Sequence, residues 1–284
     1  MDLTPLPEIS WIDLPGVVNM RDVGGKPTAD GRVTLPGVII RTDNLQDLPE
    51  TSVRRLVDEM GVTDVVDLRT NLERHETGNG PLKAEALTFH ELSMYAEEAQ
   101  ETGIPEDGDE AELPWKDDFS EKSREELGHE EHLAGHYMGY LSNRPDNVLK
   151  ALRAIATSPG AVLVHCAAGK DRTGTICALA LSEVGVDREA VVADYDATNE
   201  RVELIFERLA NTPTYAADLS RQQVADQTTP AATMRMLLER LDQTHGVDGQ
   251  GGVHGWLVSQ GWTEHDHRAL RIKLLGADAL EEEN

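Results

Sequence analysis

The stretch "VLVHCAAGKDRTG", residues 162–174, is unlike the rest of the chain. An apolar run ends at a histidine and a cysteine, and a loop of small residues then carries a lysine, an aspartate and an arginine. The run is typical of a buried strand, and "TGTICALALSEVG" (173–185) has the apolar spacing of a helix that Gly185 can end. A strand, a tight loop and a helix are therefore predicted to follow one another here.

A loop of this kind directs a row of backbone N–H groups at one spot, where the helix adds its positive N-terminal dipole. Such a nest binds an oxyanion, and small residues let its backbone approach the ligand closely. The arginine supplies a planar fork that matches two phosphate oxygens. The predicted phosphate-binding residues are Ala167, Ala168, Gly169, Lys170, Asp171 and Arg172.

Cys166 stands at the start of this loop. The positive field that binds phosphate also stabilises a thiolate, which is the reactive form of cysteine. The predicted result is a nucleophile aimed at the phosphorus of a bound monoester. Thr173 can donate a hydrogen bond to the sulfur, and His165 is better placed to fix the loop backbone than to touch substrate. The sequence thus predicts phosphoryl transfer through a cysteinyl-phosphate, with no metal and no cofactor.

The rest of the chain alternates between strand and helix patterns. Strands are predicted at 37–41, 62–69, 87–94 and 161–165, and helices at 49–61, 130–142, 145–157, 173–185, 187–199, 200–210, 230–246 and 265–276. This order predicts one α/β domain over residues 1–284, with a partly parallel central sheet flanked by helices. Residues 96–128 are acidic with scattered proline and glycine, which predicts a lid insertion within the domain.

Composition limits the partners of this chain. Its 52 acidic side chains against 26 Lys and Arg give a formal net charge of −26. This balance argues against nucleic acid as a partner and against a polybasic membrane anchor, because both depend on basic surfaces. No apolar run approaches the roughly 20 residues that span a bilayer, and residues 1–16 lack the pattern of a signal peptide. We therefore expect a cytoplasmic protein; its oligomeric state is not predicted.

Other reactive side chains are interpreted as structural. Eleven residues of helix, at about 1.5 Å each, would put Cys166 and Cys177 about 16 Å apart, whereas a disulfide needs Cα atoms within about 7 Å. Cys177 is expected to be plain core. The histidine-rich segments 128–132 and 265–268 could suggest metal ligands, with His136 one turn further on. We favour exposed helix histidines there.

The loop pattern, Cys-x5-Arg-Thr preceded by His and followed by Gly, resembles the signature loop of the cysteine-based protein tyrosine phosphatases. The segments "NMRDVGG" (19–25), "GVIIRTDNL" (37–45), "GVTDVVDLRTNLE" (61–73), "VVADYDATNE" (191–200), "GGVHGWL" (251–257) and "LRIKLLG" (270–276) are similar to the bacterial tyrosine phosphatase B family of atypical, partly lipid-active phosphatases. The resemblance implies that residues 96–128 form a helical lid over the active site.

Departure of an alkoxide or phenolate from phosphorus needs a proton donor. The resemblance implies that Asp171, inside the loop itself, serves as this acid, and it is our choice. "PWKDD" (114–118) superficially resembles a separate acid loop, but we interpret Asp117 and Asp118 as solvated. Asp67 is a third candidate, for which we favour a structural carboxylate paired with Arg69 or with loop amides.

The sequence therefore predicts a phosphomonoester hydrolase acting on phosphotyrosine, phosphoserine and phosphothreonine, with phosphoinositides as a further substrate class. The resemblance connects Lys170 with lipid substrates, since a lysine two residues before the signature arginine recurs in phosphoinositide phosphatases. Two alternatives stay open, a strict phosphoinositide phosphatase and a phosphate-binding module that has lost turnover. The expected partners are phosphorylated proteins or lipid head groups.

Overall fold

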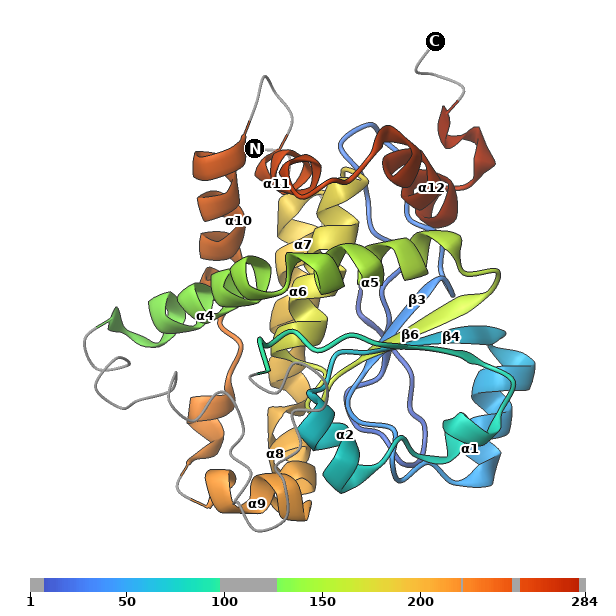
Figure 1. Cartoon of the computed structure of the whole chain (residues 1–284), viewed down its shortest axis with the longest axis vertical. Coiled ribbons are helices and arrows are strands. Elements are labelled where there is room, and N and C mark those ends of the chain that lie inside the picture. The colour runs from blue at the N-terminus through green and yellow to red at the C-terminus, as the bar shows by residue number, and fades with distance from the viewer. Residues whose placement is uncertain (1–7, 98–126, 221, 247–250, 281–284) are drawn as a thin grey trace.

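The computed structural model describes residues 8–97, 127–220, 222–246 and 251–280 (Figure 1). Its centre is a six-stranded sheet with the order β1-β2-β3-β6-β4-β5. The strands are β1 (Ser10–Trp11), β2 (Arg21–Asp22), β3 (Ile39–Thr42), β4 (Val62–Asp67), β5 (Thr88–Glu91) and β6 (Ala161–His165). The four strands from β3 to β5 in this order pair in parallel, and β1 and β2 add an antiparallel edge. The predicted α/β fold with a partly parallel sheet is confirmed.

Helices surround this sheet and fill the second half of the chain. They are α1 (Glu50–Arg54), the π-helix η1 (Arg55–Glu59), α2 (Asn71–Thr77), η2 (Pro81–Ala84), α4 (His129–Asn143), α5 (Pro145–Thr157), α6 (Asp171–Glu183), α7 (Arg188–Asp196), η3 (Ala197–Arg201), α8 (Val202–Ala210), α9 (Pro213–Leu219), η4 (Val224–Gln227), α10 (Ala231–His245), α11 (Gly252–Ser259), α12 (Glu264–Leu275) and η5 (Ala277–Leu280). The helix predicted over 49–61 is divided between α1 and η1, and α2, α9 and α11 were not predicted. The strand predicted over 87–94 ends at Glu91.

Alternate residues of the central strand β6 face two different cores. Val162 and Val164 belong to the larger core, which is built mainly from α4 to α7 and α10 to α12. Ala161 and Leu163 belong to the smaller core, beneath α1, η1 and η2. Because successive side chains of a strand point to opposite faces, a strand covered on both sides has to be apolar throughout. This explains why "AVLV" shows no polar alternation.

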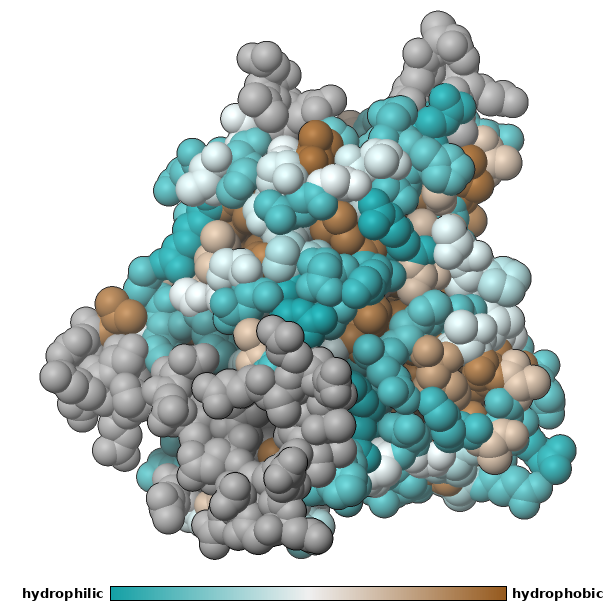
Figure 2. Space-filling view, in the orientation of Figure 1, coloured by the Kyte–Doolittle hydropathy of each residue, from teal (hydrophilic) through white to brown (hydrophobic). Residues whose placement is uncertain are grey.

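The outer surface contrasts with these cores. Figure 2 shows a face that is mostly hydrophilic, with hydrophobic residues in small separate patches. Among the described residues, none of the helices is both long enough and apolar enough to cross a bilayer.

The order of the strands brings three loops together at one edge of the sheet. His165 at the end of β6 pairs with Thr42 of β3 on one side and with Asp67 of β4 on the other. The segments that follow these three strands therefore leave the sheet side by side. In α/β proteins, ligands bind at the carboxyl ends of parallel strands, so this edge is where a functional site is expected.

Candidate active site

Cys166 is the first residue after β6, and α6 begins five residues later at Asp171. The loop between them turns at Gly169, whose φ is +66°. A Cβ atom on Gly169 would lie 2.3 Å from the carbonyl oxygen of Thr42, which no side chain could tolerate. Both the left-handed backbone and this close approach require glycine. The loop is thus seated directly against the end of β3.

The carbonyl groups of this loop are held by the surrounding scaffold. The Asn19 side chain donates to the carbonyls of Ala168 (2.9 Å) and Gly169 (3.2 Å). Arg41 donates to Gly169 (2.8 Å), and the backbone N–H of Asn44 donates to Ala167 (3.0 Å). In a planar trans peptide the N–H points away from the C=O. Because the scaffold holds these carbonyls on one side of the loop, the N–H groups of the same peptides point to the opposite side.

A buried carboxylate holds the cations that support the loop. Asp194 of α7 accepts a hydrogen bond from Arg41 at 2.6 Å and lies 3.5 Å from both Arg21 and Lys26. Arg21 also donates to Asn19 at 2.6 Å. Burial opposes ionisation of Asp194, but these three cations outweigh it and keep the pKa of Asp194 below its ordinary value. The cluster fixes Asn19 and Arg41, the two side chains that hold the loop carbonyls.

Arg172 lies at the start of α6 and is only 6% exposed. Its guanidinium donates to both carboxylate oxygens of Glu73, at 2.6 and 3.0 Å. Glu73 also accepts from Tyr215 (2.9 Å) and closes the capping box of α2 with Thr70. Burial disfavours the charge on Arg172, but Glu73 outweighs it and raises the pKa of Arg172 above its ordinary value. The bidentate pair fixes the direction of the guanidinium.

Asp67 at the end of β4 forms a bidentate ion pair with Arg69, the closest contact being 2.6 Å. Its side chain is 2% exposed, and His165 Nε2 lies 3.7 Å from it. Burial lowers the pKa of His165 to about 4, so this ring is neutral at pH 7. Burial also disfavours the charge on Asp67, but His165 and Arg69 together hold the pKa of Asp67 below its ordinary value. Because His165 is neutral at pH 7, Arg69 is the partner of Asp67 that is charged at this pH.

Asp171, the first residue of α6, keeps 24% of its side chain exposed. Tyr137 of α4 donates to one carboxylate oxygen at 2.5 Å, and Tyr137 in turn contacts the hydroxyl of Tyr195 at 2.7 Å. Burial and the negative charge of Asp171 raise the pKa of Tyr137 well above its ordinary value, so Tyr137 remains a donor. The second oxygen of Asp171 lies 3.6 Å from Lys170 Nζ.

The remaining predicted residues occupy specific positions around the loop. Lys170 is buried, at 5% exposure, and its amino group donates to the backbone and side-chain oxygens of Gln227 in η4, both at 3.0 Å. His165 Nδ1 lies 3.2 Å from the carbonyl oxygen of Cys166, which fits the expected contact with the loop backbone. The buried Thr173 hydroxyl has no hydrogen-bond partner among the described residues. The expected contact between Thr173 and the sulfur is therefore not formed in this structure.

Cys166 and Cys177 are both free and both buried. Cys177 lies in the middle of α6 within the larger core, where burial raises its pKa to about 11 despite the nearby Arg41. The prediction that the two cysteines do not pair agrees with this arrangement.

The other sequence candidates are not brought to this site. His129, His132 and His136 of α4 do not form one cluster, since His129 contacts Thr228 and His136 contacts Tyr95. His132 is 6% exposed, so the expectation of exposed histidines on this helix was wrong for it. The "PWKDD" segment with Asp117 and Asp118, and nearly all of the predicted insertion 96–128, lie outside the described residues.

Sequence reasoning missed several residues that support the loop. Arg41 lies in a predicted strand, Asp194 in a predicted helix and Asn19 in a segment similar to a family, but no motif connects these three side chains with the loop. Glu73 completes a Thr-x-x-Glu capping box, a recognisable signal for a helix start but not for a partner of Arg172. Tyr137 carried no sequence signal, because only the packing of α4 over the start of α6 brings it to Asp171.

The α/β fold, with a cysteine at the end of a central strand followed by a short loop, an arginine and a helix, is the arrangement expected of the cysteine-based tyrosine phosphatases. The chain belongs to the tyrosine phosphatase family, whose sequence model matches residues 12–276.

Two relatives agree with this assignment. The chain is 33% identical over 206 residues to the triple specificity protein phosphatase PtpB of Mycobacterium tuberculosis, covering 70% of this chain and 72% of that protein. It is 28% identical over 161 residues to a tyrosine-protein phosphatase of Nostoc commune, covering 55% of this chain and 46% of that protein. The predicted resemblance to tyrosine phosphatases is confirmed.

Proposed function

We propose that this protein hydrolyses phosphomonoesters in two steps, through a cysteinyl-phosphate on Cys166. In the first step the thiolate attacks phosphorus, a sulfur–phosphorus bond forms, and the bond from phosphorus to the leaving oxygen breaks while Asp171 gives its proton to that oxygen. In the second step a water loses a proton to Asp171 and attacks phosphorus, and the sulfur leaves as thiolate. Inorganic phosphate is released, and no cofactor takes part.

The arrangement of the loop carbonyls carries this proposal. Because Asn19, Arg41 and Asn44 hold the carbonyls of the loop on one side, its N–H groups are available to the equatorial oxygens of a phosphoryl group in front of Cys166. Donors that are fixed before the substrate binds need no reorganisation during the reaction. The buried ion pair with Glu73 keeps Arg172 in place beside them.

Asp171 is better suited than Asp67 to donate the proton. Asp67 is buried, and the bidentate pair with Arg69 holds it ionised. Asp171 is partly exposed at the edge of the loop and is oriented by Tyr137.

Leaving-group dependence tests the assignment of the acid. Asp171→Asn should slow the hydrolysis of alkyl phosphates by about 10²–10⁴-fold, the usual contribution of general acid catalysis. The effect on p-nitrophenyl phosphate should be much smaller, since nitrophenolate leaves with little protonation. Asp67→Asn, the matched control, should slow both substrates equally or lower stability. Leaving-group dependence in Asp67→Asn and not in Asp171→Asn would reverse the assignment.

The covalent step is tested separately. Cys166→Ser should abolish turnover of p-nitrophenyl phosphate while inorganic phosphate or vanadate still binds. Rapid acid quench of the wild-type enzyme with radiolabelled substrate should trap label on the peptide that contains Cys166. Substantial turnover by Cys166→Ser, or label on another residue, would contradict the mechanism. A protein that binds vanadate but shows no turnover in the wild type would instead be a phosphate-binding module.

We propose phosphotyrosine, phosphoserine and phosphothreonine as substrates, with phosphoinositides as a further class. The support is the similarity to a phosphatase described as having triple specificity and the position of Lys170 beside Asp171 at the edge of the loop. Rates on a phosphotyrosine peptide, a phosphoserine peptide and short-chain inositol lipids would test the range. Turnover of the inositol lipids alone would favour the strict phosphoinositide phosphatase.

A further inference from the structure

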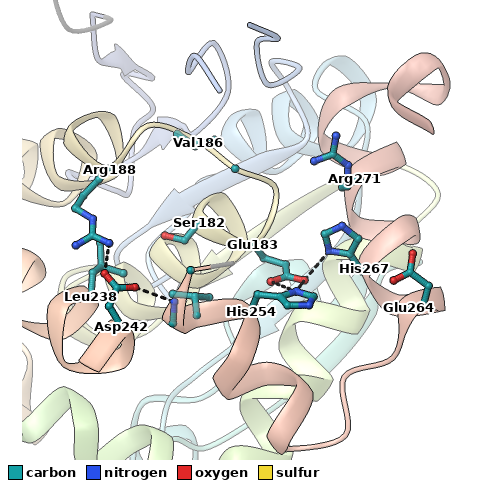
Figure 3. A pocket seen from close by; sticks show the side chains of 14 residues that line it. Ser182, Glu183, Val186, Arg188, Leu238, Asp242, His254, Glu264, His267 and Arg271 are labelled. Atoms are coloured by element: carbon teal, nitrogen blue, oxygen red, sulfur yellow. Dashed lines mark hydrogen bonds and ion pairs between the residues drawn. The ribbon is translucent and has the colours of Figure 1, made fainter. Parts of the chain in front are cut away.

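A second cluster of reactive side chains lies at the opposite end of α6 from the loop of residues 166–172, called the phosphate loop from here on. Glu183 is the last residue of α6, and twelve helical steps of about 1.5 Å place it about 18 Å from Asp171. It lines a pocket of about 490 Å³ together with His254 of α11 and His267 of α12. Figure 3 shows both imidazole rings turned toward the Glu183 carboxylate. Three separate helices thus converge on one carboxylate.

The contacts within this cluster are short. The Nδ1 atoms of His254 and His267 lie 3.1 and 2.7 Å from the same oxygen of Glu183, Oε1. One ligand atom from each of the three residues can be chosen so that all lie within 4.8 Å of one another. The Trp262 indole N–H donates to the same Glu183 oxygen at 2.9 Å, which fixes the carboxylate from the core side. Both histidines keep part of their side chains exposed toward the pocket, 23% and 17%.

The charges around the cluster favour a cation. The Glu183 side chain is fully buried, so its negative charge is poorly screened by water. Glu264 lies in the same pocket wall as His267 (Figure 3). The two arginines of the pocket are both in ion pairs, Arg188 with Asp242 in the same pocket and Arg271 with Asp30. Glu183 and Glu264 therefore add negative charge to the lining of this pocket.

We propose that Glu183, His254 and His267 form a zinc-binding site that clamps α11 and α12 onto the end of α6. Two imidazole nitrogens and one carboxylate oxygen are a donor set that Zn²⁺ accepts, whereas Mg²⁺ and Ca²⁺ prefer oxygen ligands only. The pocket in front of the cluster leaves room for a water as the fourth ligand. The ion would stabilise the fold and take no part in hydrolysis, because the phosphate loop lies at the far end of α6.

The ion requires shifts of at most about 1.5 Å between ligand atoms, because atoms within 4.8 Å of one another have to come to about 3.3 Å. Tetrahedral zinc with ligand bonds of about 2.0–2.1 Å keeps neighbouring ligand atoms about 3.3 Å apart. The two Nδ1–Oε1 distances of 2.7 and 3.1 Å would therefore lengthen by about 0.2–0.6 Å. Once Nδ1 of each ring binds the metal, the hydrogen of that ring has to lie on Nε2. The partial exposure of both rings lets water accept that hydrogen.

Calorimetric titration of the full-length, chelator-treated protein with zinc chloride tests this site. We expect one zinc ion per chain, bound equally well by Cys166→Ser, which removes the active-site thiol as a competing ligand. His254→Ala and His267→Ala should each weaken binding by at least about 100-fold, because even outer partners of metal ligands are worth roughly 10–100-fold. Saturating zinc should raise the midpoint of thermal unfolding by roughly 5 °C in the wild type and in Cys166→Ser, and should leave it unchanged in His254→Ala and His267→Ala.

His265→Ala is the matched control, since His265 is exposed on the same helix two residues from His267. It should bind zinc like the wild type. The proposal is overturned if the wild type binds no zinc, or if the His254 and His267 variants bind zinc as tightly as this control. Should the variants fail to fold, the anomalous signal in crystals of the wild type grown with zinc decides, because a peak away from Glu183 would overturn the proposal.

Discussion

The pH dependence of stability tests the environment of His165. Its pKa in the folded protein is about 4, because burial disfavours the imidazolium, whereas an unfolded chain has a pKa of about 6.5 at this residue. Between these two values the unfolded state binds the proton and the folded state does not. Stability should therefore fall as the pH drops below about 6.5, and the loss should be complete near pH 4.

The size of the effect follows from the same two pKa values. Each pH unit below the unfolded-state pKa costs about 1.36 kcal/mol until the folded protein also takes up the proton. Lowering the pH from 6.5 to 5 should thus remove about 2 kcal/mol of stability through His165 alone. Asparagine takes up no proton in this pH range, so the His165→Asn variant should lack this part of the pH dependence. A loss of stability that is the same at every pH does not affect this comparison.

Urea unfolding of both proteins at pH 7.5 and pH 5 measures this difference. The wild type should lose about 2 kcal/mol more than His165→Asn between the two pH values, since the other titrating groups contribute equally to both. Equal losses would contradict the inference that His165 is held neutral in the folded protein. The ring would then carry a charge beside Arg69 and Asp67, and its contact with the Cys166 carbonyl would have to be interpreted differently.

Three further predictions concern the phosphate loop. Glu73→Gln should lower the free energy of unfolding, measured with urea, by about 3–5 kcal/mol, because it removes the carboxylate that pairs with the buried Arg172 charge. Bound vanadate should restore part of this stability. Gly169→Ala should abolish turnover of p-nitrophenyl phosphate and lower the unfolding midpoint, because the added methyl group meets the backbone of β3. Peroxide should inactivate the enzyme by oxidising Cys166, with early rescue by thiol and no disulfide to Cys177 by mass spectrometry.

Each of these predictions has an outcome that would contradict it. Glu91→Gln is the control for Glu73→Gln, since Glu91 pairs with Lys83 at the surface. Surface ion pairs contribute at most about 1 kcal/mol to the free energy of unfolding. Equal losses in the two glutamate variants would mean that the buried pair adds nothing. Full activity of Gly169→Ala would show that the loop does not need this turn. A disulfide-linked peptide pair from the two cysteines would show that the thiols can meet.

The sequence by itself predicted the central strands and the phosphate loop. "AVLVH" could be recognised because a strand covered on both faces must be apolar throughout, and the loop because cysteine, small residues, arginine and helix follow at fixed spacing. The acidic composition argues against nucleic acid as a partner, and this expectation needs only a count of charged residues. The strand pattern and the loop pattern depend on residues that are close together in the chain, so they can be recognised in the sequence.

Only the tertiary structure decided which distant residues support that loop. Asn19 reaches the carbonyl of Ala168 across 149 positions, and Glu73 reaches Arg172 across 99. Such contacts follow from the order of strands β3, β6 and β4, which no local pattern specifies. The pairing of Asp67 with Arg69 could be expected from their spacing, but whether both are buried depends on the sheet around them.

The histidines illustrate the same division. The sequence offered the histidines of 128–132 and 265–268 as candidate ligands, and proximity along a helix was the only available criterion. The fold instead brings His267 to His254, 13 residues earlier, and to Glu183, 84 residues away. The three proposed zinc ligands come from three helices, and none of these helices carries a recognisable motif. Only the packing of the helices brings the three side chains together.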